Sequence, residues 1–328
     1  MKLNPLSLLG IAFTFVLGGV LPAKEAFAQD YPSKPIKFIV DTSPGAVNDI
    51  WARRFAQILS EEYKQPIIVE NRPGVSGTLA AQTVLKAEAD GYTIMVGGYN
   101  PIVVYPQIGG KVSYNARSAF IPIAAGPPGP PFLAISPVKG IRSVAELRDY
   151  GKKNPNVLTC GVGGVASVYD FGCAAVAQAL DIKIRAIPYK SNIAAITDAV
   201  GGQVDLVLGY NSEVEALFDS GKLVPLSVLS SIRMNIRPNV PAFKEVSPQS
   251  IDLLAFTGFY APAGTPKVVV NKLNESILRA TKLMLTSGDF IKAPEYLLFY
   301  NVDEFGKFIY AEQSKWESMA NSFSIRAE

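Results

Sequence analysis

The chain has 328 residues, of which 48% are hydrophobic and 18% are charged, and its formal net charge is +3. A chain of this length and composition forms about two globular domains, and its small net charge argues against a nucleic-acid-binding protein. It contains no histidine, which excludes Ser-His-Asp and Cys-His catalysis as well as histidine metal sites. Because it has only two cysteines, a four-cysteine zinc site is also excluded, and we expect neither a metal nor a cofactor.

The first 28 residues have the pattern of a secretory signal peptide. Lys2 supplies a positive charge, the run from Leu6 to Leu21 is apolar, and Ala26 and Ala28 form a small-x-small cleavage site. The alternative is an uncleaved membrane anchor, but the apolar run is shorter than the ~20 residues that span a bilayer. We therefore predict export of the protein and cleavage after Ala28.

Export makes a disulfide chemically possible. Cys160 ends an expected strand, and Cys173 lies in the expected helix that follows it. A bridge between them and a pair of buried free thiols are both compatible with this pattern, because cysteine also packs well as a small apolar residue.

Strands and helices alternate in the first half of the mature chain. Apolar runs at 36–40, 66–69 and 93–96 predict three strands. A helix from about Asp49 separates the first two, and a helix with Leu79, Val84 and Leu85 separates the second and third. This β-α-β-α-β order predicts a parallel, doubly wound sheet.

The segment 121–135 interrupts this alternation with four prolines between Gly126 and Pro131. Proline cannot donate a hydrogen bond to a central strand, so we expect an extended crossing between two domains. A second alternating series follows, with strands expected at 157–160, 182–187, 204–208 and 223–229. We interpret the last of these strands as the return crossing.

Helix start signals accompany the second series. Ser143 and Glu146 form a capping box, Ser191 is placed to cap another helix, and Glu215 predicts a capping box for a helix at 212–220. A strand at 253–261, a helix starting at Thr265-Pro266 and a helix from near Asp303 complete the chain.

The expected fold is α/β with two lobes, each a mostly parallel, doubly wound sheet, joined by two crossing strands. Residues 29–127 and 231–328 form the first lobe, and 128–230 form the second. This is the organisation of a hinged binding protein.

The turns between strands and helices are the candidate binding sites, because ligands of parallel sheets bind beyond the carboxyl ends of the strands. Free N–H groups and partial positive charge at helix N-termini suit a carboxylate or a phosphate. The simpler alternative is an ordinary helix start that Asn48 or Asp49 caps. The turn after Cys160 matches G-x-G-x-x-A and imitates a dinucleotide fingerprint, but its position in the middle of an exported chain argues against that interpretation.

Several motifs together carry a resemblance to a known family. They are YPSKPIKFIV, the PG…ND…AR turn that ends at Arg53, QPIIVENRPGVSGTLAAQTV, ADGYTIMVG, PYKSNIAAITDAVGGQVD and APAGTPKVVVNKLN. With them, the mature chain resembles the Bug, or TctC-like, family of periplasmic solute-binding proteins, the receptors of tripartite tricarboxylate transporters. The resemblance implies a Venus-flytrap architecture in the periplasm, a carboxylate ligand and a membrane permease as partner. We expect the protein to be a monomer.

The resemblance also implies where the ligand binds. Its carboxylate lies near the first two strand-to-helix turns, partly through ordered waters, and the turns of the second lobe close over it. The residues that we expect at this site are Ser43, Gly45, Ala46, Asn48, Asp49, Ser76, Gly77, Thr78, Tyr99, Gly163, Gly164, Ser167, Tyr169, Lys190, Tyr210 and Asn211.

The chain departs from the family pattern at five positions. Ala46 replaces a second glycine, Tyr169 stands near a frequent histidine, Gly209-Tyr210 replaces an Asp-Asn pair, and Tyr99 replaces a small residue. The pocket is therefore expected to be more aromatic, which favours an aromatic or apolar carboxylate over an amino acid. A sensor that presents the closed form to a signalling partner and an exported hydrolase that works without histidine are the alternatives.

Overall fold

The computed structural model describes residues 31–165, 167–249, 251–287 and 297–323. The predicted signal peptide and its cleavage after Ala28 lie outside these residues. Within them, no helix is both long enough and apolar enough to cross a membrane.

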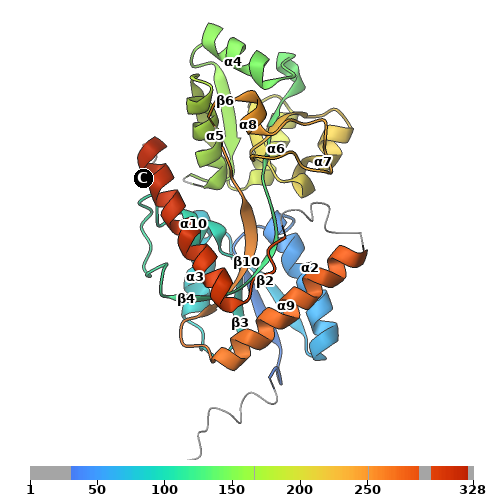
Figure 1. Ribbon diagram of the computed structural model, residues 1–328, viewed down its shortest axis with the longest axis vertical. Helices are drawn as coiled ribbons and strands as arrows, with labels where there is room; N and C mark the ends of the chain where they lie inside the picture. The colour runs from blue at the N-terminus through green and yellow to red at the C-terminus, as the bar shows by residue number, and fades with distance from the viewer. Residues whose placement is uncertain (1–30, 166, 250, 288–296, 324–328) are drawn as a thin grey trace, which may run out of the picture. The chain divides into compact units, whose positions relative to one another are not determined.

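The first sheet has the strand order β2-β1-β3-β10-β4 (Figure 1). Its strands are β1 (Ile36–Val40), β2 (Ile67–Asn71), β3 (Thr93–Gly97), β4 (Phe120–Gly129) and β10 (Ala255–Pro262). Strands β1, β2 and β3 are parallel, whereas β10 runs antiparallel to both β3 and β4. Strand β10 is buried along its whole length, which agrees with its place between two neighbours.

The second sheet has the order β7-β6-β8-β5-β9. It consists of β5 (Phe132–Ile135), β6 (Leu158–Val162), β7 (Ile184–Pro188), β8 (Leu206–Gly209) and β9 (Val224–Val228). Strands β6, β7 and β8 are parallel, and β5 runs antiparallel to β8 and β9. The predicted two-lobed α/β fold is confirmed, with a parallel part and an antiparallel part in each sheet.

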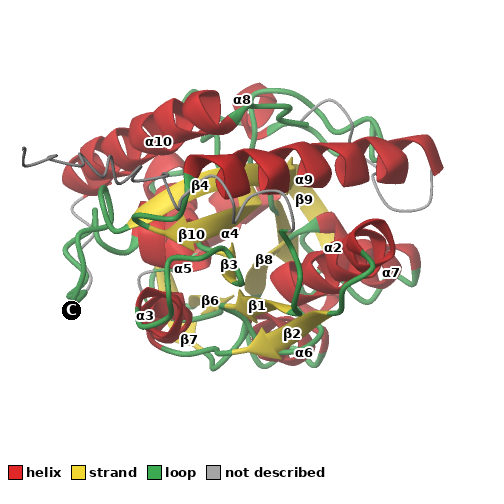
Figure 2. Ribbon diagram, turned by 90° about the horizontal axis from the view of Figure 1, so that it is seen from below, coloured by secondary structure: helices red, strands yellow, loops and turns green. Residues whose placement is uncertain are grey.

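Helices flank both sheets. They are α2 (Val47–Tyr63), α3 (Thr78–Leu85), α4 (Val144–Lys153), α5 (Val168–Ala179), α6 (Asn192–Val200), α7 (Asn211–Asp219), α8 (Phe243–Val246), α9 (Lys267–Ser287) and α10 (Val302–Phe323). Figure 2 shows α9 and α10 beside β4, which both helices contact. As predicted, Ser143 and Ser191 cap their helices, because their Oγ atoms accept hydrogen bonds from the N–H groups of Glu146 and Ala194.

The first crossing between the sheets is where the prolines predict it, between the end of β4 at Gly129 and the start of β5 at Phe132. The predicted return crossing at 223–229 is wrong. Strand β9 pairs with β5 along the edge of the second sheet, so it belongs to that sheet. The chain returns to the first sheet between Leu253 and the start of β10 at Ala255. Leu253 is still attached to the second lobe, since its N–H donates a hydrogen bond to the Leu229 carbonyl.

The lobe boundaries stay predictions. Met234, Val240 and Ala242 share a buried cluster with Phe132 of the second sheet. Since these residues follow position 230, they favour a second boundary nearer to the start of β10 than to residue 231.

Cys160 and Cys173 are joined by a disulfide, with their Cα atoms 6.4 Å apart. The bridge links the middle of β6 to α5. Of the two alternatives that the sequence left open, the structure has the bridged form.

Helix α10 connects the two lobes through Trp316, whose side chain is fully buried. Its ring lies 6.1 Å from the ring of Tyr99, which follows β3, and 4.6 Å from the ring of Phe171 on α5. Figure 1 shows α10 (red) passing beside both β4 and α5. The C-terminal helix is therefore part of the packing of both lobes.

Candidate functional site

A cavity of about 870 Å³ lies at the ends of the parallel strands of both sheets. From the first lobe it is lined by segments within 41–51, 73–77 and 99–105, and from the second by segments within 163–169, 189–192 and 210–215. These are the strand-to-helix turns at which the sequence predicts the ligand. The first crossing contributes Pro130 to the lining, and the start of β10 contributes Phe256.

The structure brings most of the predicted site residues to this cavity. Those that line it are Ser43, Ala46, Asn48, Ser76, Gly77, Tyr99, Gly163, Gly164, Tyr169, Lys190, Tyr210 and Asn211. Gly45, Asp49, Thr78 and Ser167 do not line it. Their part in ligand binding stays a prediction, and hydrogen bonds give Gly45, Asp49 and Ser167 a structural role.

Asp49 fixes the turn between β1 and α2. It is 3% exposed, and its carboxylate accepts hydrogen bonds from the Gly45 N–H at 2.8 Å, from Arg53 Nε at 3.1 Å and from Asn71 Nδ2 at 2.9 Å. Burial opposes the charge of Asp49, but these three donors outweigh it and keep the pKa below its ordinary value. Asp49 therefore ties the start of α2 to the end of β2.

Ser167 has the corresponding role in the second lobe. Its Oγ accepts a hydrogen bond from the Asp170 N–H at 3.3 Å and donates to the Gly164 carbonyl at 2.8 Å, which caps α5.

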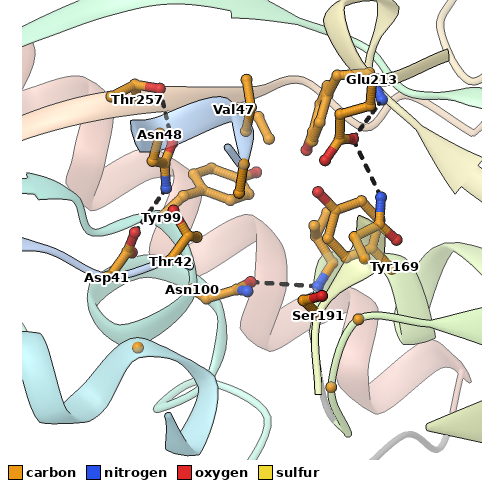
Figure 3. A pocket seen from close by; sticks show the side chains of 18 of the residues that line it. Asp41, Thr42, Val47, Asn48, Tyr99, Asn100, Tyr169, Ser191, Glu213 and Thr257 are labelled. Atoms are coloured by element: carbon orange, nitrogen blue, oxygen red, sulfur yellow. Dashed lines mark hydrogen bonds between the residues drawn. The ribbon is translucent and has the colours of Figure 1, made fainter. Parts of the chain in front are cut away.

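Asp41 is a cavity residue that the sequence analysis missed (Figure 3). It directly follows β1 and is 6% exposed, and its carboxylate accepts hydrogen bonds from Asn48 Nδ2 at 2.7 Å and from the Gly98 N–H at 2.8 Å. Asn48 Oδ1 in turn accepts a hydrogen bond from Thr257 on β10. Burial raises the pKa of Asp41 to about 6, against the effect of these hydrogen bonds.

The raised pKa of Asp41 predicts how stability depends on pH. The folded chain retains this proton up to about pH 6, whereas the unfolded chain releases it near the ordinary value of 3.8. The stabilisation is thus complete below about pH 4 and is lost as pH rises through 6, by about 3 kcal/mol. We expect Asp41→Asn to remove this part of the pH dependence in urea unfolding.

The control is Asp149→Asn on α4, whose side chain is 64% exposed. It should leave the pH dependence of the free energy of unfolding as in the wild type. Identical pH dependences for wild type and Asp41→Asn would contradict the prediction.

Three tyrosines give the cavity an aromatic wall. The rings of Tyr169 and Tyr210 lie 5.9 Å apart at 67°. Tyr99 comes from the other lobe and is 5% exposed, and its hydroxyl donates to Glu312 at 3.1 Å and accepts from Trp316 Nε1 at 2.9 Å. Helix α10 therefore fixes the Tyr99 ring at the edge of the cavity.

Glu213 is the second cavity carboxylate that the sequence analysis missed. Its Oε2 accepts hydrogen bonds from the Tyr210 N–H at 3.0 Å and from Asn192 Nδ2 at 3.1 Å. The predicted capping box with Glu215 is therefore wrong, since the N-cap of α7 is Tyr210, two residues before Ser212, and Glu213 takes the position expected for Glu215. Burial raises the pKa of Glu213 to about 7 despite these two donors.

Two hydrogen bonds join the lobes at the rim of the cavity. Ser76 Oγ donates to the Val165 carbonyl at 3.0 Å, and the Val168 N–H donates to Asn100 Oδ1 at 3.3 Å. Side chains of the first lobe thus contact the backbone at the start of α5. Within the described ranges, no group of His, Cys, Asp and Glu side chains is arranged to bind a metal ion.

Comparisons with known proteins agree with this geometry. The chain is 32% identical over 285 residues to a UPF0065 protein of Bordetella bronchiseptica, an alignment that covers 86% of this chain and 84% of that protein. The structure of Rpa4515 of R. palustris with adipate is similar with a TM-score of 0.82 at 25% identity, over 90% of this chain and 99% of that chain. MatC of Rhodopseudomonas palustris with bound malate has a TM-score of 0.78 at 26% identity, over 88% and 99%.

A family match covers most of the chain as well. The family described as "Tripartite tricarboxylate transporter family receptor" matches residues 51–323. This range contains every strand from β2 onward and most of the turns that line the cavity. The motifs, the fold and the match agree, and the chain belongs to the tripartite tricarboxylate transporter receptor family.

Proposed function

We propose that the protein is a periplasmic receptor that binds an organic carboxylate in the cavity between its lobes and delivers it to a tripartite membrane permease. The family and the similar structures with adipate and malate support a carboxylate ligand. The observation that carries the proposal is that two helices begin at the cavity with no side chain capping their first N–H groups.

Two helices of the first lobe begin at the cavity without a side-chain cap. Helix α2 has Ala46 at its N-cap and α3 has Gly77, and neither position makes a side-chain hydrogen bond to the helix. In the second lobe, Ser167 and Ser191 cap α5 and α6 with their own hydroxyl groups. Since the first N–H groups of a helix have no acceptor within it, the starts of α2 and α3 are suited to a carboxylate.

The aromatic wall supports an apolar ligand body. Tyr99, Tyr169 and Tyr210 line the cavity together with Trp51 and Phe256. A flat or apolar ligand body gains contact area against these rings, so we propose a carboxylate whose body is aromatic or otherwise apolar.

A thermal-shift screen of the mature protein, beginning at Gln29, tests the proposed function. A carboxylate that binds only the folded chain adds about 2.7 kcal/mol of stability at 100 times its dissociation constant. For a protein of this size the melting temperature then rises by several degrees. If adipate, phenylacetate and benzoate all leave the melting temperature unchanged over a wide concentration range, the proposed ligand class is wrong.

The variant Tyr210→Ala tests the aromatic preference. It should weaken phenylacetate binding by roughly threefold to tenfold, because aromatic contacts contribute about 0.5–1.5 kcal/mol, and should leave adipate binding nearly unchanged. Tyr310→Ala is the control, since Tyr310 is 55% exposed on α10 and lies outside the cavity lining. An equal loss for both acids in titration calorimetry would show that Tyr210 has only a structural role.

A further inference from the structure

Three residues of the second-lobe wall of the cavity, Asn192, Asn211 and Glu213, each have a buried hydrogen-bond acceptor that no described donor reaches. Asn192 is 7% exposed, and its Nδ2 donates to the Leu208 carbonyl at 3.0 Å and to Glu213 Oε2 at 3.1 Å. Both partners are acceptors, which establishes that the amide nitrogen faces them and that the amide oxygen is on the opposite side. This buried Oδ1 has no hydrogen-bond partner among the described residues.

Glu213 also has one side-chain atom with hydrogen-bond partners and one buried oxygen without any. Its Oε2 takes both hydrogen bonds from the protein, and its Oε1 is shielded from solvent with no donor in the described part of the chain. Figure 3 shows this carboxylate oriented into the cavity, opposite Asn48 and Thr42 of the first lobe. Asn211 Nδ2 donates to Glu215 at 3.2 Å, and this leaves its buried Oδ1 as a third acceptor without a described donor.

A group with several N–H donors would satisfy these three oxygens. A buried acceptor without a partner costs free energy, so a binding site pairs it with a donor from its ligand. An ammonium group has three N–H donors, and a neutral hydroxyl has only one. The neighbouring rings of Tyr169 and Tyr210 provide negative ring faces that attract a cation.

The charges around the cavity point the same way. Among the described lining residues of the second lobe, the ionisable side chains are Glu213, Glu215 and Lys190, so carboxylates outnumber cations there. Burial raises the pKa of Glu213 to about 7, and a cation beside this carboxyl would favour its ionised form. A second carboxylate on the ligand would meet like charge at the second lobe, whereas a cation would meet opposite charge.

We propose that Asn192, Asn211 and Glu213 form a subsite for a cationic amine, and that the ligand carries this amine at the end opposite its carboxylate. This inference rests on the proposed carboxylate binding at α2 and α3 of the first lobe. Because the acceptors belong to the other lobe, the amine and the carboxylate are at different ends of the ligand. An α-amino acid, whose two groups share one carbon, does not fit this arrangement.

Calorimetric titration with acids matched in chain length tests the subsite. The probes are 4-aminobutanoate and 6-aminohexanoate, the diacids succinate and adipate, the monoacids butanoate and hexanoate, and 2-aminohexanoate. We expect one of the two terminal amino acids to bind at least about tenfold more tightly than the diacid and the monoacid of its length. A hydrogen bond that involves a charged group contributes enough binding free energy for this difference. The 2-aminohexanoate should gain nothing over hexanoate.

The variant Glu213→Gln reverses the polarity of the subsite while keeping its structure. Its amide oxygen can still accept from the Tyr210 N–H and Asn192, and its amide nitrogen replaces the oxygen that faces the cavity. We expect the amino acid to bind about tenfold more weakly, the diacid to bind more tightly, and the monoacid to be unchanged. Asp219→Asn is the matched control, since it makes the same change of charge on α7 at a side chain that is 61% exposed and does not line the cavity, and it should leave these ratios unchanged.

The outcomes separate the two proposals. If adipate or hexanoate binds but no terminal amino acid is preferred, or if Glu213→Gln and Asp219→Asn have equal effects, the amine subsite is wrong and carboxylate binding stands. If none of these acids binds but phenylacetate or benzoate does, the amine subsite is wrong; if those two fail as well, the carboxylate proposal itself fails. An unchanged melting temperature of unliganded Glu213→Gln confirms that the variant is folded.

Discussion

Gly97→Ala is expected to prevent stable folding. Gly97 ends β3 with φ at 118°, and a Cβ at this position would overlap the carboxylate of Asp41. Asp41 cannot move away without losing its hydrogen bonds to Asn48 and to the Gly98 N–H, and it is buried. We expect the free energy of unfolding to fall by more than about 4 kcal/mol, the range of substitutions that force overlap in a core.

Gly140→Ala is the control for the backbone conformation alone. Gly140 also has a positive φ, at 70°, but a Cβ there meets nothing within 4 Å. The substitution should lower the free energy of unfolding by only about 1–2 kcal/mol, because alanine must adopt the left-handed conformation there. Equal losses for the two variants in urea unfolding would show that overlap with Asp41 does not matter.

Trp316→Ala is expected to destabilise the protein by about 3–5 kcal/mol, as the removal of a large buried aromatic side chain does. The indole is fully buried, packs on Phe171 of the second lobe and donates to the hydroxyl of Tyr99 in the first. The loss should be visible as a lower midpoint in urea unfolding.

Trp316→Phe separates packing from hydrogen bonding. It keeps a ring between Phe171 and Tyr99 but removes the donor, so the expected loss is about 1 kcal/mol for the hydrogen bond and a further part for the smaller ring. If Trp316→Ala costs no more than Trp316→Phe, the indole does not link the lobes.

Local patterns were sufficient to predict the parallel half of each sheet. The runs at 36–40 and 93–96 are apolar, and turns with glycine follow them. The strand, the turn and the helix at each place can therefore be predicted from neighbouring residues alone. The position of β10 is different, because its pairing with β3 and β4 depends on segments far apart in the chain. The role of β9 was wrong for the same reason, since only its partner β5 identifies it as an edge strand.

The cavity turns were predictable because helix starts and strand ends carry recognisable residues. Asp41 was missed because it follows an apolar run and reads as the end of a strand. Glu213 was missed because Tyr210 is an unusual N-cap, and the serine two residues later placed the helix start too late. Asp41 could have been found because it is the first residue beyond the carboxyl end of a parallel strand, where ligands bind. Glu213 could have been found from its three-residue spacing from Tyr210, which is the spacing of a capping box.

The central place of β10 in the first sheet determines which of the two sheets can be completed first as the chain is made. A chain that emerges from its N-terminus presents β1, β2, β3 and β4 early, but the strand that joins β3 to β4 is translated only after the whole second sheet. The second sheet is built from one continuous segment and can pair as soon as β9 is available. Because long-range pairing is the slow part of folding, we expect the lobe that contains the N-terminal strands to be completed last and the uncapped starts of α2 and α3 to reach their final positions late.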